Sequence, residues 1–253
     1  MVPVDGGEVW AGDTGGGGPA LVLLHPGWGD SAIWLQMLEL LAPGYRAVRY
    51  DARGHGRSPA PRAPFTQLGD LIAVLDYCKV DQVVPVAHSG GGGTALGLAL
   101  GYPGRTSSMI LLAPGVQDYP WPEDPYFAEF DALYSAGDQD GLVALGLRTW
   151  AAADADPAAA AQVHSAVAAF FRQGDFQRPD PPAYGRLGEI RVPTVVAIGD
   201  RDYPMVIECA ERIAERIPSS QSIPLPGADH MVPLRAPSTL VGLIAEYAPR
   251  RGR

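Results

Sequence analysis

The sequence has few cysteines and few basic residues. Only 2 of its 253 residues are cysteine, and 19 Lys and Arg stand against 28 Asp and Glu. Cys78 and Cys209 show neither CxxC nor metal-ligand spacing, so we expect free thiols, buried or half-buried, in a reducing compartment. The formal charge of −9 works against a nucleic-acid partner, because a phosphate backbone attracts clustered Lys and Arg.

Long hydrophobic runs are also missing. No stretch approaches the roughly 18 apolar residues that a membrane span needs. The N-terminal MVPVDGGEVW has neither the basic region nor the apolar region of a secretory signal. We therefore expect a soluble, cytoplasmic protein with no membrane partner.

What the sequence does contain is a regular alternation of short apolar runs with amphipathic segments. The strand-like runs are ALVLLH (20–25), YRAVRYD (45–51), VVPVA (83–87), SMILLAP (108–114), TVVAIGD (194–200) and SIPLP (222–226). The helical segments are IWLQMLELL (33–41), TQLGDLIAVLDYC (66–78), TALGLALGY (94–102), VIECAERIAERI (206–217) and STLVGLIAEYA (238–248). This alternation predicts an α/β fold with a mostly parallel sheet and helices on both of its faces.

One long region interrupts the alternation. Three helical patterns, at 126–135, 140–151 and 157–173, lie between two expected strands, and a structureless loop of that length would be improbable. We therefore predict a helical insertion over residues 117–184 in a core domain formed by residues 1–116 and 185–253. Its many aromatic residues are expected to pack the insertion onto the core.

The stretch VVPVAHSGGGGTAL (83–96) joins an expected strand to an expected helix through Ser89. A nucleophile elbow places a serine on such a turn and requires small residues two positions to either side, here Ala87 and Gly91. Taken alone, the motif also fits a serine that only caps a helix. Pro85 lacks the N–H of a central strand residue, so we expect a bulge or irregular pairing there.

A serine nucleophile needs a histidine that accepts its proton and a carboxylate that orients the histidine. Asp202 in GDRD (199–202) and His230 in GADH (227–230) each follow an expected strand. The carboxyl ends of parallel strands meet at one edge of a sheet, where ligands bind. The order Ser, Asp, His is therefore compatible with a catalytic triad, in which Asp200 is the competing carboxylate.

Four motifs together make the chain resemble the α/β-hydrolase fold superfamily, among the small-molecule hydrolases with a helical cap. They are LHPGWGDS (24–31), DARGHGRS (51–58), AHSGG (87–91) and the pair GDRD with ADH (228–230), spread over essentially the whole chain. The resemblance implies an α/β-hydrolase fold whose insertion is a cap. Within the superfamily, the chain is similar to esterases, enol-lactone hydrolases and hydrolases of C–C bonds in diketones.

The resemblance also implies roles for single residues. Ser89 would be the nucleophile, His230 the general base and later acid, and Asp202, rather than Asp200, the orienting acid. The backbone N–H of Gly90 would be one oxyanion-hole donor.

The second oxyanion donor is less determined, because the His-Gly of the family is here His25-Pro26, and proline has no N–H. We expect Trp28 as this donor, with Gly27 as the alternative. The histidines of the motifs, His25, His55 and His88, are expected to be hydrogen-bonded scaffold residues.

A small or medium apolar substrate is suggested by the aromatic residues of the cap, and the candidate substrate-binding residues are Trp28, Trp121 and Tyr126. The expected function is a serine hydrolase of small-molecule esters or lactones that works through an acyl-enzyme. The alternative is a lyase, a dehydratase or a C–C bond hydrolase using the same triad. The sequence carries no fingerprint for a metal, nucleotide or flavin, so we expect no cofactor; the oligomeric state, monomer or homodimer, stays open.

Overall fold

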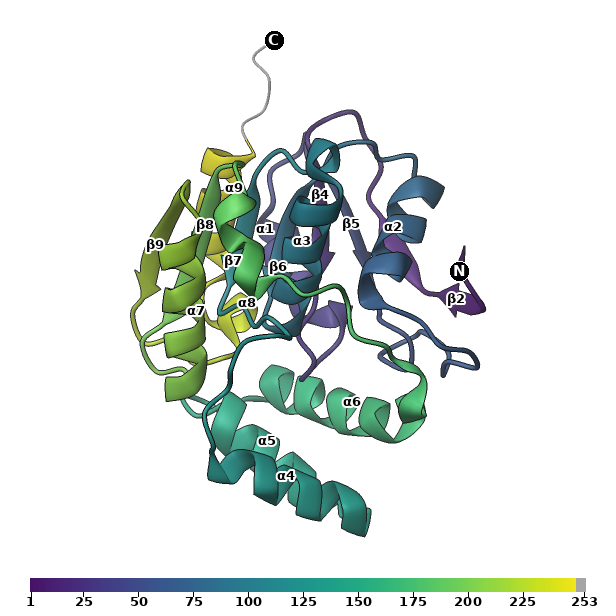
Figure 1. Ribbon diagram of the computed structural model, residues 1–253, viewed down its shortest axis with the longest axis vertical. Helices are drawn as coiled ribbons and strands as arrows, with labels where there is room; N and C mark the ends of the chain where they lie inside the picture. Colours follow the sequence, from purple (N-terminus) through teal and green to yellow (C-terminus); the bar gives the residue numbers. More distant parts are fainter. Residues whose placement is uncertain (249–253) are drawn as a thin grey trace.

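A seven-stranded sheet forms the centre of the protein, as the computed structural model in Figure 1 shows for residues 1–248. The last five residues of the predicted core domain, 249–253, lie outside the described residues. In spatial order the strands are β3 (Ala11–Asp13), β5 (Arg46–Tyr50), β4 (Ala20–Leu24), β6 (Val84–His88), β7 (Met109–Leu112), β8 (Thr194–Gly199) and β9 (Ser220–Leu225). Only β3 runs antiparallel to its neighbour. The predicted mostly parallel sheet is confirmed.

A separate hairpin of β1 (Val2–Val4) and β2 (Gly7–Val9) precedes the sheet. The alternation of long apolar runs did not predict it, because strands of three residues carry too few side chains to establish a period of two.

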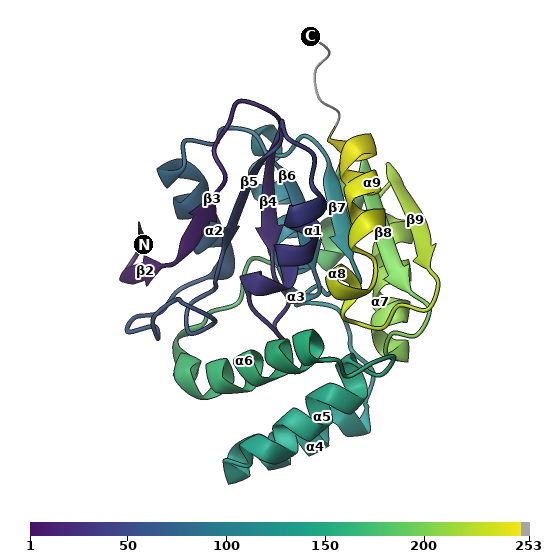
Figure 2. The ribbon, with the colours of Figure 1, turned by 180° about the vertical axis from the view of Figure 1, so that it is seen from behind.

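Helices cover both faces of the sheet, as predicted (Figures 1 and 2). One face packs against α1 (Leu35–Leu40), α8 (Val232–Arg235) and α9 (Pro237–Tyr247), and the other against α2 (Gln67–Tyr77), α3 (Gly90–Gly101) and α7 (Pro204–Arg216). Short 3₁₀ turns lie at Ser31–Trp34, Pro103–Arg105, Gly174–Phe176 and Tyr184–Glu189. None of the helices within residues 1–248 is both long and apolar enough to cross a membrane.

The central strands are buried on both faces, which explains their continuous apolar sequences. In β4, Leu21 and Leu23 belong to one core cluster, while Val22 and Leu24 belong to the other. Successive side chains of a strand point to opposite faces, so one short run supplies both cores.

The insertion between β7 and β8 is helical, as predicted. Its helices are α4 (Pro125–Ala136), α5 (Gln139–Trp150) and α6 (Pro157–Gln173), each within one residue of the expected bounds at either end. Each begins at an aspartate whose side chain accepts a hydrogen bond from a backbone N–H of the first turn, a strong N-cap. Figures 1 and 2 show this layer across one end of the sheet.

Pro85 disturbs the pairing of β6 on one side only. Toward β4 the register runs continuously through Pro85, which pairs with Val22. Toward β7, bridges form at Val83 and Val86, and between these two bridges the neighbouring chain contains one residue more than β6 does. The predicted irregular pairing is therefore confirmed, and its cause is the missing N–H of proline.

Candidate active site

Ser89 lies on the turn between β6 and α3 and has an unusual backbone conformation. Its φ of 53° and ψ of −119° fall in a region that L-residues with side chains rarely occupy. Such strain persists only where the surrounding structure enforces it, and it often occurs at active sites. The turn places the Ser89 side chain beyond the carboxyl end of the central strand.

The glycines after Ser89 make this turn possible. A Cβ atom on Gly91 would lie 2.8 Å from the carbonyl oxygen of Leu24, and one on Gly92 would lie 2.7 Å from Cβ of Pro114. Neither backbone approach tolerates a side chain. Gly90 differs, because outside its own helix and its chain neighbours the one described atom within 4 Å of its Cβ position is the backbone nitrogen of Gly27, at 3.7 Å.

His230 lies between Ser89 and Asp202 and forms hydrogen bonds with both. Its Nε2 is 2.9 Å from Oγ of Ser89, and its Nδ1 is 2.8 Å and 3.1 Å from the two carboxylate oxygens of Asp202. An ionised carboxylate can only accept, so Nδ1–H donates to Asp202 and Nε2 is free to accept from the serine hydroxyl. Both side chains are almost completely buried, at 2% and 0% exposure.

The two candidate aspartates, Asp200 and Asp202, both follow β8 but have different hydrogen-bond partners. Asp202 also accepts a hydrogen bond from the N–H of Tyr203, at 2.6 Å. Asp200 is exposed and accepts one from the N–H of Gly227, at 2.6 Å, so it fixes the neighbouring turn and makes no hydrogen bond to His230.

The candidate oxyanion donors are Gly90, Trp28 and, as the alternative to Trp28, Gly27. Gly90 and Gly27 line the same small cavity, and the nitrogen of Gly27 lies 3.7 Å from the Cβ position of Gly90. The N–H of neither glycine donates to a protein acceptor within residues 1–248. The backbone N–H of Trp28 likewise donates to no protein acceptor within residues 1–248. Its indole donates to Oη of Tyr126, at 3.0 Å. The Trp28 ring is 8% exposed and packs edge-on against Phe170 beneath the cap.

Two of the three motif histidines are hydrogen-bonded scaffold residues, as predicted. Nδ1–H of His25 donates to the carbonyl of Pro26, while Nε2 accepts from the N–H of Ala52. His55 donates to the carbonyl of Gly29, and burial lowers the pKa of His55 to about 3.

For His88 the prediction of a hydrogen-bonded residue is wrong. The side chain is fully buried, and neither ring nitrogen has a hydrogen-bond partner within the described residues. Its ring lies 4.9 Å from that of His230, and burial holds the pKa of His88 well below its ordinary value. A neutral ring therefore packs beneath the triad, because the position before the elbow points into the core.

A cavity of about 350 Å³ opens at Ser89 and His230. The three predicted substrate-binding residues, Trp28, Trp121 and Tyr126, all line it. Sequence reasoning missed its polar lining residues, which are Gln67, Thr94, Gln117, Asp118, Gln177 and Asp180. They belong to no motif, and four of them come from irregular segments, so no periodic signal could have found them.

A smaller cavity of about 160 Å³ adjoins the first. The two share four lining residues, Gln67, Gly90, Thr94 and Gln177. Gly90 therefore borders both an aromatic space and a more polar space.

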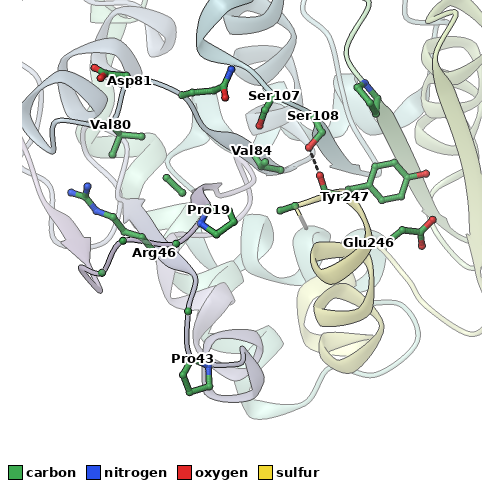
Figure 3. A pocket seen from close by; sticks show the side chains of 18 of the residues that line it. Pro19, Pro43, Arg46, Val80, Asp81, Val84, Ser107, Ser108, Glu246 and Tyr247 are labelled. Atoms are coloured by element: carbon green, nitrogen blue, oxygen red, sulfur yellow. Dashed lines mark hydrogen bonds between the residues drawn. The ribbon is translucent and has the colours of Figure 1, made fainter. Parts of the chain in front are cut away.

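A larger depression, of about 1430 Å³, lies elsewhere (Figure 3). Pro19, Val84 and Ser108 line it, and these residues lie at the amino ends of strands whose carboxyl ends carry the site. None of the triad residues borders it. Chemistry, and not volume, identifies the candidate active site.

Comparisons with known proteins agree with this geometry. The Alpha/beta hydrolase family matches residues 21–242. The candidate carbamate hydrolase RutD of Caulobacter sp. (strain K31) is 26% identical over an alignment of 255 positions, which covers 91% of this chain and 92% of that protein.

Two solved structures resemble almost the whole chain. Est816, an N-acyl homoserine lactone degrading enzyme, has a TM-score of 0.81 and 25% identity and covers 97% of this chain and 99% of its own. The enol-lactonase from Burkholderia xenovorans LB400 has a TM-score of 0.77 and 20% identity, with coverages of 96% and 97%. The predicted resemblance is confirmed, and the chain belongs to the α/β hydrolase family.

Proposed function

We propose that the protein is a serine hydrolase that cleaves a small-molecule ester or lactone through Ser89, His230 and Asp202. The observation that carries the proposal is the hydrogen-bonded series from Asp202 through His230 to Ser89, on a strained turn that opens into a cavity. The similarity to a lactone-degrading enzyme gives independent support.

In the first half of the reaction, Nε2 of His230 removes the hydroxyl proton of Ser89 while Oγ attacks the carbonyl carbon of the substrate. Asp202 stabilises the imidazolium that forms and holds its tautomer. The imidazolium then protonates the leaving alkoxide, the C–O bond breaks, and an acyl-enzyme remains on Ser89.

In the second half, His230 accepts a proton from a water molecule that attacks the acyl carbon. The tetrahedral intermediate collapses, the proton returns from His230 to Oγ of Ser89, and the carboxylic acid leaves. A lactone follows the same steps, except that its leaving alcohol stays attached to the acyl chain. Hydrolysis of the acyl-enzyme then releases a single hydroxy acid.

The negative oxygen of each intermediate needs donors in place before the reaction. We assign these to the N–H groups of Gly90 and Gly27. The N–H groups of Gly27 and Trp28 both lack a protein acceptor within residues 1–248, and we choose Gly27 because its nitrogen lies 3.7 Å from the Cβ position of Gly90 and the two glycines line one cavity. This replaces the expectation of Trp28 by its stated alternative. Trp28 is assigned to the cavity wall.

The insertion then acts as a cap over the reaction centre, and we keep 117–184 as its proposed bounds. Tyr126 brings a hydroxyl to the aromatic side of the cavity, and burial raises the pKa of Tyr126 to about 12, so it stays protonated at neutral pH. The hydroxyl already accepts from the Trp28 indole and retains its own proton for a substrate oxygen.

The experiment compares wild type with Ser89→Ala on p-nitrophenyl acetate, an unsubstituted lactone, a phenyl carbamate and a β-diketone. Hydrolysis of the ester or lactone by wild type alone is the expected result. Cleavage of the diketone without ester or lactone turnover would instead support the C–C bond hydrolase alternative. Ester hydrolysis retained by a folded Ser89→Ala would contradict the proposed nucleophile.

A further inference from the structure

The two adjoining cavities at Ser89 are lined by carboxyl groups and by three histidines, His25, His55 and His230. Their lining includes the carboxyl groups of Asp118 and Asp180, and none of the described residues that line either cavity is Lys or Arg. His55 contributes no positive charge at neutral pH, because burial lowers its pKa to about 3. A bound substrate therefore meets negative charge and hydrogen-bond acceptors.

Asp180 is the carboxyl group that is better placed to contact a substrate. One of its oxygens accepts from the N–H of Leu68 at 2.9 Å, and the other lies 3.4 Å from Oγ1 of Thr94. Thr94 follows Gly90 by one turn of α3, and positions four apart lie on the same helix face, roughly 5–6 Å from each other. Asp180 thus lies about one helical turn beyond the proposed oxyanion hole.

Asp180 lines the cavity and retains unused hydrogen-bonding capacity. A carboxylate has about four acceptor positions, of which the two contacts occupy half. Burial raises the pKa of Asp180, and the charge of Asp70 acts in the same direction. The hydrogen bonds from Leu68 and Thr94 oppose this rise, and no described Lys or Arg forms an ion pair with Asp180. A donor or a cation on the substrate would therefore stabilise its ionised form further.

Asp118 is engaged differently. Its carboxylate accepts hydrogen bonds from the backbone N–H groups of Ala183 and Tyr184, all at 3.0 Å, and these bonds help to lower the pKa of Asp118. It is a fixed negative charge at the cavity wall. Its backbone partners leave it less capacity than Asp180 for a substrate donor.

We propose that the site selects neutral or cationic esters and lactones and rejects those that carry a carboxylate, with Asp180 as the specificity-determining residue. This proposal rests on the proposed serine hydrolase function. A substrate hydroxyl, amide N–H or ammonium group donates to Asp180, whereas a substrate carboxylate is repelled and finds no cationic partner in the lining.

The test uses three p-nitrophenyl esters with similar acyl chains: the hexanoate, the adipate monoester with a terminal carboxylate, and the 6-aminohexanoate with a terminal ammonium. For wild type at neutral pH we expect kcat/KM for the adipate monoester to be about 10-fold or more below that for the hexanoate. We expect the ammonium ester to match or exceed the hexanoate. Equal kcat/KM for adipate and hexanoate esters would overturn the proposal.

Asp180→Asn assigns the effect to its residue. We expect this variant to raise the ratio of adipate to hexanoate kcat/KM by on the order of 5-fold. Asp131→Asn is the matched control, because it makes the same charge change at an exposed position of α4 outside the cavities. An equal shift in both variants would show a long-range charge effect and overturn the role of Asp180.

A second measurement needs no variant. Hexylammonium and hexanoate ions compete with the hexanoate ester for wild-type protein, and we expect the lower inhibition constant for hexylammonium. A lower constant for the hexanoate ion would overturn the proposal. Turnover of the neutral ester, and its loss in Ser89→Ala, reports on the proposed hydrolase function separately, so the two proposals fail in different experiments.

Discussion

The carboxyl-end edge of the sheet, which carries Ser89, Asp202 and His230, and the cap are held in place by different kinds of contact. This carboxyl-end edge is called the sheet edge below. At the sheet edge, hydrogen-bond ladders and backbone contacts that exclude side chains fix Ser89, and the loops after β8 and β9 bury Asp202 and His230. The cap rests on side chains instead, and its outer helix α4 has no buried residue. Backbone contacts thus position the proposed catalytic residues, whereas side-chain contacts position the cap that forms part of the cavity wall.

Polar side chains connect the cap to the core at several points. Oγ of Ser165 donates to the carboxylate of Asp30 at 2.6 Å. Arg235 forms ion pairs with Asp156 at the start of α6 and with Asp229, the residue before His230, at 2.6 Å and 3.0 Å. The Arg235 fork therefore connects the cap directly to the loop that carries the histidine.

Asp202→Asn is expected to have the largest effect, because it changes the carboxylate that accepts the hydrogen bond from Nδ1–H of His230. The amide favours the wrong tautomer of His230, and kcat should fall by about 10⁴-fold for every substrate. Steady-state kinetics measure this. Asp200→Asn is the control and should keep activity close to wild type; a greater loss in the control would reverse the assignment of the two aspartates.

Gly91→Ala should reduce stability, because its Cβ would meet the backbone oxygens of Leu24 and His25 at 2.8 Å and 2.9 Å. Backbone of a central strand cannot move away easily, and overpacking of this kind costs about 1–3 kcal/mol. Urea unfolding gives the free energy. Gly90→Ala has open space around its Cβ, so its free energy of unfolding should stay near that of wild type. Equal losses of unfolding free energy in both variants would refute this account of the elbow.

Gly146→Ala makes the corresponding change in the cap. The new Cβ would overlap the Trp28 ring and lie 2.7 Å from a methyl carbon of Val163. A cap held by side chains can shift outward, and alanine also gains about 1 kcal/mol of helix propensity over glycine. We expect a smaller loss of unfolding free energy than in Gly91→Ala, with a changed KM. A loss as large as that of Gly91→Ala would show that the cap is as rigid as the core.

The pH dependence of stability should come partly from His55 in the core. Its pKa is about 3 in the folded protein and about 6.5 when unfolded, so below pH 6.5 the unfolded state binds the extra proton. As the pH is lowered below about 6.5, this residue should therefore reduce the free energy of unfolding by up to about 1.4 kcal/mol for each pH unit. Urea unfolding at pH 7 and 5 should show a weaker dependence in His55→Asn. An unchanged slope would contradict the neutral buried state.

The sequence predicted those parts of the protein in which local sterics leave little choice. A strand, a serine and glycines with no room for side chains fix the elbow, and alternating apolar runs fix the parallel sheet. Pro85 predicted its own irregular pairing through the N–H that it lacks.

Contacts between irregular segments could not be read in the same way. Asp180 approaches Thr94 and Leu68 only because the chain leaving the cap folds back over α2 and α3. The contact between Arg235 and Asp156 likewise joins positions 79 residues apart. Nothing in the local sequence around His88 reveals that its ring is left without a hydrogen-bond partner, since this depends on what packs above it.

The most direct test of the central claim is to locate a covalent adduct. Wild-type protein is treated with a fluorophosphonate, digested, and mapped by mass spectrometry while residual ester hydrolysis is followed. We predict a single adduct on Ser89, formed in proportion to the loss of activity and absent from Ser89→Ala. Full modification of Ser89 with ester hydrolysis unchanged would contradict the proposed mechanism.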